Sequence, residues 1–239
     1  SELARTKLSI EEISSCADLV NNLGMDLIIT PFDKLALDQI MEKNINLSAI
    51  KIASCDLTNL NLIEHCAKTG LPLILSTGMS YEREIILTSK HLKKLMVEHA
   101  FLHCNSTYPS PSEDINLKYI KRLQNITQTI VGFSSHDGNS TIPIGAICQG
   151  AKIVEFHITR SIESPGTDHR ASIETKDIKN LVQNSKLVHK ALGESKPRIP
   201  SQGELSNRLS LGKSLALNKN MKKGEIIKKE DLILLSPGS

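Results

Sequence analysis

One pattern recurs along most of this chain of 239 residues. In each copy, a short apolar run that favours a strand is followed by a segment with apolar residues at helical spacing. The copies start about 23 to 30 residues apart. The candidate strands begin near Met25, Ala49, Pro72, Ala100, Ile130 and Ile153. Short apolar strands that alternate with amphipathic helices are typical of a parallel sheet covered by helices.

The repeat predicts an α/β fold of the (β/α)8, or TIM, barrel type. It favours a barrel over a doubly wound sheet because no glycine-rich dinucleotide turn follows any of the strands. About six βα units are recognisable, so the barrel domain, residues 1–194, is expected to be incomplete. Residues 195–206 contain two prolines and a glycine and are the predicted linker. A strand, a turn and another short strand follow in residues 207–239.

Local signals predict where several elements begin and end. Ser9–Glu12 is a capping box that opens the first helix. Met25–Thr30 is expected to be a buried strand, and Asp33 to cap the helix after it. Glu174–Leu192 is expected to be the last helix of the barrel, with a glycine stop directly after it.

Composition excludes several classes of partner. The formal net charge is +3, with 29 basic and 26 acidic residues well mixed, so the chain lacks the charge footprint of a nucleic-acid-binding protein. No apolar run approaches the roughly 20 residues of a membrane span, and the N-terminus does not have the form of a secretory signal. The five scattered cysteines lack Cys-x-x-Cys spacing, which indicates free thiols in a reducing cytoplasm. We therefore expect a cytoplasmic protein that binds neither nucleic acid nor membranes.

Polar residues collect just after the ends of the predicted strands. In a barrel these positions all fall on the carboxyl-terminal face, where active sites are built. His136 and His157 end two neighbouring candidate strands, with a helix-like segment, Ile142–Gly150, between them. Because a crossover helix makes such strands parallel, both imidazoles should lie on one rim, where they can hold a metal. Lys51 lies within another buried strand and therefore requires an anionic partner.

Six motifs follow one another along the chain. They are Lys51–Ser54 (KIAS), Leu75–Met79 (LSTGM), His103–Pro111 (HCNSTYPSP), Gly132–His136 (GFSSH), Gly150–Thr159 (GAKIVEFHIT) and Gly166–His169 (GTDH). In this order they resemble the sialic acid synthase family, which includes N-acetylneuraminate, legionaminate and pseudaminate synthases. The resemblance runs from about Ile29 to Asp168. In addition, Lys222–Glu225 and Asp231–Leu232 resemble the start of the family's C-terminal antifreeze-like, or SAF, domain.

The resemblance implies a reaction and the positions that serve it. Members of the family condense phosphoenolpyruvate (PEP) with a 2-acetamido mannose-type sugar and release phosphate. The positions that match their PEP- and phosphate-binding residues are Thr30, Lys51, Ser54, Ser76 and Ser134. The positions that match their sugar-binding residues are Ser106, Tyr108 and Asp168. A homodimer is the assembly that the resemblance implies.

The resemblance also implies a metal and two catalytic residues. His136 and His157 match the pair of divalent-metal ligands; the metal implied is manganese, with Mg²⁺ or Co²⁺ as alternatives, acting as a Lewis acid on the sugar's aldehyde. Lys51 and Asp56 match catalytic positions. Asp56 could orient the attacking water or assist proton transfer, or it could instead cap the helix that follows Asn59. The family usually shows Ser-Asp-His-Thr around the first histidine, where this chain has Ser-Ser-His-Asp.

The predicted function is that of a PEP-dependent transferase that forms a C–C bond with a 2-acetamido or 2,4-diacetamido hexose and yields a sialic acid or related nonulosonic acid. The family's barrel starts about two βα units earlier and its SAF domain extends further, so this polypeptide is expected to be a fragment. Two alternatives stay open. One is another PEP aldol-type synthase that makes a shorter 3-deoxy-ulosonate, against which the antifreeze-like segment counts. The other is a non-catalytic truncated barrel that only binds sugar or phosphate.

Overall fold

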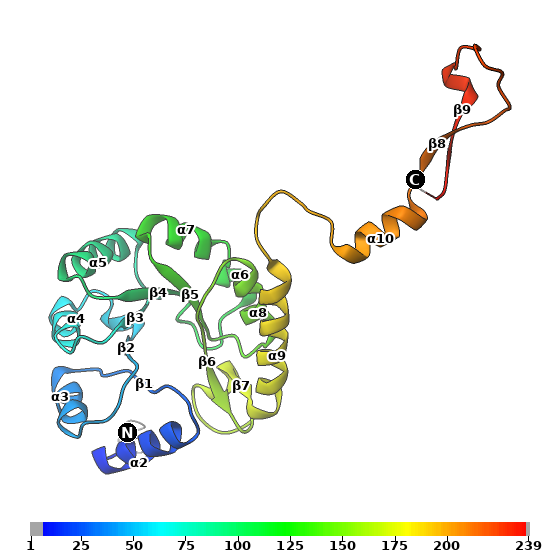
Figure 1. Ribbon diagram of the computed structural model, residues 1–239. Coiled ribbons are helices and arrows are strands. Elements are labelled where there is room, and N and C mark those ends of the chain that lie inside the picture. Colours follow the sequence, from blue (N-terminus) through cyan, green and yellow to red (C-terminus); the bar gives the residue numbers. More distant parts are fainter. Residues whose placement is uncertain (1–6, 238–239) are drawn as a thin grey trace. The chain divides into compact units, whose positions relative to one another are not determined.

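The chain divides into two compact units, Ser1–Gly193 and Glu194–Ser239, and the computed structural model describes residues 7–237. In the first unit, seven parallel strands form one sheet in which every strand lies beside its neighbours in the chain. The strands are β1 (Ile28–Ile29), β2 (Ala49–Ile52), β3 (Leu73–Ser76), β4 (His99–Cys104), β5 (Ile130–Ser135), β6 (Val154–Thr159) and β7 (Ser172–Glu174). The sheet curls, and the helices lie on its outer side (Figure 1). This is the predicted incomplete α/β barrel, open between β1 and β7 in the part that the structure describes.

Helical segments precede, connect and follow the strands. They are α2 (Ile10–Asn22), α3 (Lys34–Glu42), η1 (Ser54–Asp56), α4 (Leu60–Ala67), α5 (Glu82–Leu95), α6 (Ser112–Ile115), α7 (Tyr119–Thr127), α8 (Thr141–Cys148), η2 (His169–Ala171) and α9 (Thr175–Leu192). The predicted capping box at Ser9 opens α2, and the Asp33 carboxylate accepts a hydrogen bond from the Ala36 amide at 2.7 Å to cap α3. None of the helices within residues 7–237 has the length and apolar character that crossing a membrane requires.

The two edges of the sheet differ from the sequence prediction. The buried strand expected at Met25–Thr30 is wrong in extent and burial, because β1 holds only two residues and Ile28 is 46% exposed. Within the described residues β1 pairs only with β2, so its other side is not covered by a strand. At the opposite edge, β7 pairs with β6 through Ile158 and Ile173. A strand of three residues gives no periodicity to read, which is why the sequence did not indicate it.

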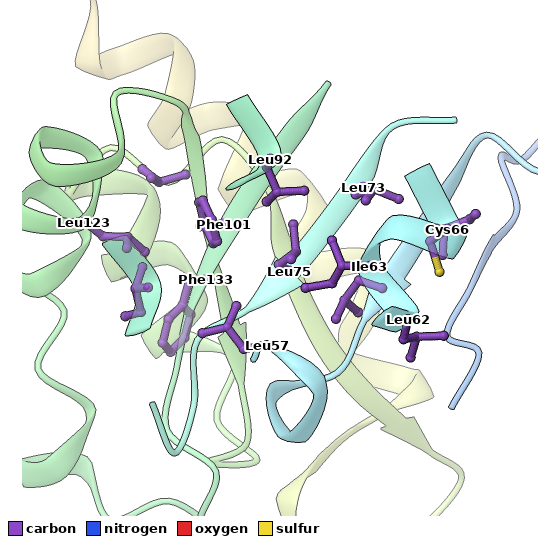
Figure 2. Packing of buried hydrophobic residues seen from close by; sticks show 14 of the residues in the cluster. Leu57, Leu62, Ile63, Cys66, Leu73, Leu75, Leu92, Phe101, Leu123 and Phe133 are labelled. Carbon is purple, nitrogen blue, oxygen red and sulfur yellow. The ribbon is translucent and has the colours of Figure 1, made fainter. Parts of the chain in front are cut away.

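The apolar core lies between the sheet and its helices. Successive side chains of a strand point to opposite faces, so Ile50 and Ile52 of β2 join this core whereas Lys51 points away from it. Figure 2 shows part of the core, which includes Phe101 of β4 and Phe133 of β5. The inner face carries apolar residues such as Ile74 and Leu102, and polar residues such as Lys51, Ser76 and Ser134 lie near the carboxyl ends of its strands, where the site is built.

The second unit is small. It consists of α10 (Gln202–Leu211), β8 (Ser214–Leu217), η3 (Lys229–Asp231) and β9 (Leu232–Leu235). β8 and β9 form an antiparallel pair. Helix α10 is opened by a capping box of Ser201 and Glu204, so the expected linker, residues 195–206, contains the start of a helix. The assignment of this unit to a SAF domain stays a prediction.

We expect Phe101→Ala to lower the free energy of unfolding by about 3 to 5 kcal/mol, because it leaves a cavity in a close-packed core. Urea unfolding followed by circular dichroism measures this, since the chain has no tryptophan. Leu87→Ala on the exposed side of α5 is the control and should change stability by less than about 1 kcal/mol. Equal losses in the two variants would contradict this packing.

Candidate active site

The carboxyl ends of the strands surround a cavity of about 450 Å³. Most of the predicted site residues line it, namely Thr30, Lys51, Ser54, Ser76, Ser106, Tyr108, Ser134, His136 and His157. They come from β2 to β6 and from the loops that follow these strands, apart from Thr30, which follows β1. The structure therefore brings together residues that are far apart in the sequence. Of the predicted site residues, only Asp56 and Asp168 lie outside this lining.

Lys51 is the buried cation of the cavity. Its side chain is 8% exposed, and its Nζ donates to the Ile52 carbonyl at 3.0 Å and lies 3.7 Å from the Glu155 carboxylate. Burial lowers the pKa of Lys51, and the neighbouring Glu155 charge opposes that shift. The anionic partner that the sequence required for this lysine is therefore Glu155 of β6.

Glu155 is a site residue that was not expected from the sequence. Glu155 precedes His157 by two positions, so both side chains belong to the same face of β6. Its carboxylate also accepts a hydrogen bond from the Ser134 hydroxyl at 2.7 Å, which links Lys51, Glu155 and Ser134 in one network. The period-two alternation around His157 is the signal that could have revealed it.

Hydroxyl groups surround the lysine. The Ser76 Oγ is buried and has no hydrogen-bond partner within residues 7–237. A buried hydroxyl without a partner is rare and fits a ligand with acceptor oxygens. The Ser54 hydroxyl accepts a hydrogen bond from the Gly78 amide at 3.2 Å. Lys51, Ser54 and Ser76 thus offer the kind of donors that an anion requires.

Gly78 lets the loop after β3 approach the floor of the cavity. A Cβ atom at this position would lie 2.0 Å from the Ser106 hydroxyl and 2.8 Å from the Ser54 hydroxyl, well inside van der Waals contact. The Cys104 thiol would lie 3.1 Å away. A larger residue here would displace the Ser54 or Ser106 hydroxyl, and the Gly78 amide itself donates to Ser54.

His136 and His157 stand together on the rim, with their ring centroids 5.3 Å apart. The Nδ1 atom of His136 donates to the Asn105 carbonyl at 2.9 Å. Burial lowers the pKa of His157, and the neighbouring His136 lowers it further. For His136, burial alone would lower the pKa, but hydrogen bonding with Cys104 and Asn105 outweighs it and raises the pKa.

These two histidines fit a divalent metal by their donor chemistry. A backbone carbonyl that fixes the Nδ1 proton of a histidine, as Asn105 does for His136, is the support that metal-ligating histidines usually have. The carboxylate of Asp137 does not take this role, because the Nδ1 atom of His136 bonds to the Asn105 carbonyl, and one Asp137 oxygen accepts from the Ser135 hydroxyl. Within the described residues no third His, Cys, Asp or Glu completes a ligand set, so water or substrate oxygens would supply the remaining ligands.

Asp56 lies on the surface beside the cavity. Its carboxylate accepts hydrogen bonds from the Asn59 amide at 2.9 Å and from the Cys55 thiol. The alternative that Asp56 caps the next helix is wrong, because the Asn59 side chain caps α4 by accepting from the Leu62 amide. The short turn η1 directs Ser54 and Cys55 to the cavity and leaves Asp56 outside its lining.

A second cavity of about 750 Å³ adjoins the first. The loop from Ile162 to Arg170, which includes Asp168, forms most of its wall. Tyr108 lines both cavities and is the residue that they share. Burial, together with the nearby acidic groups of Cys104 and Asp168, raises the pKa of Tyr108 to about 12, so the phenol keeps its proton at neutral pH.

We expect Glu155→Gln to lower the free energy of unfolding by about 1 kcal/mol, because buried Lys51 then loses its carboxylate partner. The expected loss of stability is small for a buried ion pair because the Glu155 side chain is 41% exposed and water screens its charge. Urea unfolding measures it, with Glu113→Gln on the exposed side of α6 as the control. The double variant Lys51→Met/Glu155→Gln should recover most of the loss; an equally unstable double variant would disprove the pairing.

Known proteins resemble this chain in sequence and in fold. The NeuB family profile matches residues 2–197. The chain is 36% identical to the N,N'-diacetyllegionaminic acid synthase of Legionella pneumophila, over 99% of this chain and 67% of that protein. It is 32% identical to the human N-acetylneuraminate-9-phosphate synthase, over 86% of this chain and 56% of that protein.

The fold has a close counterpart among solved structures. The crystal structure of N-acetylneuraminic acid synthetase from Leptospira borgpetersenii, in complex with citrate, superposes with a TM-score of 0.78 at 32% identity. The match covers 86% of this chain and 72% of that one. The sequence match and the shared fold lead to one conclusion: the chain belongs to the NeuB family of sialic acid synthase-like enzymes, which form C–C bonds from PEP.

Proposed function

We propose that this chain condenses PEP with an acetamido sugar of the mannosamine type to form a nonulosonic acid and release phosphate. The observation that carries the proposal is the position of buried Lys51 beneath a rim that holds His136 and His157, all lining one cavity. The buried lysine among hydroxyl groups suits the phosphate of PEP. The histidine pair, with a bound metal, suits the aldehyde of the sugar.

Lys51 and the surrounding hydroxyls would bind the phosphate end of PEP. The phosphate accumulates negative charge as it leaves, and fixed donors in a water-poor cavity stabilise that charge most effectively. The residues proposed for this role are Thr30, Lys51, Ser54, Ser76 and Ser134. Because Glu155 already accepts from Ser134 and faces Lys51, it also limits how much positive charge the cavity offers before PEP arrives.

His136 and His157 would hold the divalent metal, for which manganese is proposed with Mg²⁺ or Co²⁺ as alternatives. When bound, the metal supplies a Lewis acid that polarises the aldehyde of the open-chain sugar. The Asn105 carbonyl orients His136 for that task. Carbon 3 of PEP then forms the new bond to the aldehyde carbon, water adds to carbon 2, and phosphate departs.

The acceptor sugar is proposed to lie against Ser106, Tyr108 and Asp168. Ser106 lines the smaller cavity, Asp168 the larger, and Tyr108 both, so a sugar that contacts all three spans the two. No step of the reaction is assigned to Asp56, because it lies outside the lining of both cavities. The homodimer and the cytoplasmic location stay predictions.

We expect Lys51→Ala to weaken PEP binding at least tenfold, since it removes the buried cation and with it a charge-assisted hydrogen bond. Isothermal titration of PEP into the protein, with and without Mn²⁺, measures this. Binding of N-acetylmannosamine should change far less, and Lys121→Ala on the exposed side of α7 should change neither. Equal losses for PEP and sugar would argue against a phosphate role for Lys51.

We expect His136→Ala and His157→Ala each to abolish Mn²⁺ binding, because they are the only histidines within residues 7–237 that line the cavity. Electron paramagnetic resonance of free Mn²⁺ in a titration measures it. His189→Ala, which removes an exposed histidine of α9, should bind like the wild type. Unchanged Mn²⁺ affinity in both rim variants would remove the metal from the proposal.

A further inference from the structure

Tyr108 stands between the two cavities and against both metal-binding histidines. It follows β4 in the loop that carries Asn105 and Ser106. Its ring centroid lies 4.3 Å from that of His136 and 5.9 Å from that of His157. Tyr108 is 43% exposed, so part of it remains open to solvent. Tyr108 can therefore contact both the histidine pair and a ligand in the larger cavity.

The hydroxyl of Tyr108 contacts one particular atom. It lies 3.2 Å from the Nε2 atom of His136. The Asn105 carbonyl can only accept a hydrogen bond, so the Nδ1 atom of His136 carries the proton in the neutral ring. Nε2 is then left with a lone pair, and the Tyr108 hydroxyl donates to it. This lone pair is also the one that a metal bound by His136 has to use.

We propose that Tyr108 is a positioning residue that couples the metal to the acceptor sugar. The metal and the Tyr108 hydroxyl compete for the Nε2 lone pair of His136, and metal binding releases the hydroxyl to a sugar in the larger cavity. The proposal rests on the proposed function, since it takes the metal pair and the acceptor from it. It adds a preferred order, in which the metal binds before the sugar.

Thermodynamic linkage makes the coupling reciprocal. If a bound metal raises the affinity for the sugar, the bound sugar raises the affinity for the metal by the same factor. The competing hydrogen bond limits that factor, because a single hydrogen bond of this kind changes an equilibrium by roughly two- to tenfold. A tyrosine that only packs against the histidines would contribute nothing to this coupling.

Tyr108→Phe tests the competition, because it removes the hydroxyl and keeps the ring. We expect it to tighten Mn²⁺ binding roughly two- to tenfold, measured by electron paramagnetic resonance at about pH 8, above the ordinary histidine pKa. In calorimetry with N-acetylmannosamine, saturating Mn²⁺ should raise sugar affinity of the wild type by a similar factor. The variant should show a smaller Mn²⁺ effect on sugar affinity, because the contribution of the released hydroxyl is lost and only direct contact between metal and sugar remains.

Tyr119→Phe is the matched control. The Tyr119 hydroxyl donates to the Glu82 carboxylate and its ring lies 5.3 Å from the ring of His103, so it is a tyrosine beside a histidine outside the metal pair. Its Mn²⁺ affinity should equal that of the wild type. Unchanged or weaker Mn²⁺ binding by Tyr108→Phe overturns the proposal, as does a wild type that binds no Mn²⁺.

PEP binding, measured on the same samples, separates this proposal from the proposed function. If the wild type binds PEP but Tyr108→Phe does not tighten Mn²⁺ binding, the coupling is wrong and the PEP site stands. If the wild type binds neither PEP nor Mn²⁺, both are wrong. Circular dichroism of each variant shows that a changed affinity does not come from unfolding.

Discussion

The site depends on one ion pair in the interior of the sheet. Lys51 is a buried cation on β2, and its charge is tolerated because Glu155 of β6 lies 3.7 Å away. The two strands are not neighbours in the sheet, so the pair can form only if the sheet curls. The same curvature therefore gives the sheet its barrel shape and lets Glu155 balance the charge of Lys51 in the cavity. Ser134, which donates to the same carboxylate, ties β5 into it.

The sequence predicted much of this structure because its strongest signals are local. The strands β2 to β6 are apolar runs between helices, and their ends carry Lys51, His136 and His157, so periodicity and parallel pairing place them on one rim. The family resemblance added the serines and Tyr108. These predictions rest on short stretches of sequence and on the rule that the carboxyl ends of parallel strands lie on the same face of the barrel.

What the sequence did not predict depends on distant contacts or on very short elements. Glu155 becomes a site residue only through Lys51, which lies on a strand far earlier in the chain. Asp56 was predicted either to act in catalysis or to cap the next helix; the turn η1 leaves its carboxylate outside the cavity lining, where it accepts a hydrogen bond from Asn59. The strand β7 is too short for any periodicity. The alternation around His157 could place Glu155 on the inner face of β6, but its contact with Lys51, the position of Asp56 and the pairing of β7 require the folded backbone.

The two cavities are built from different kinds of structure. The smaller one is lined by strand residues and by the turns and loops that follow the strands, whereas the larger one is walled mostly by the loop from Ile162 to Arg170. Loops tolerate change more readily than the strands that they connect. On the proposed function, PEP would bind in the smaller cavity and part of the sugar in the larger one, so that a change in the loop would change the sugar without changing the fold. Because Tyr108 lines both cavities and contacts His136, it joins the larger cavity to the histidine pair.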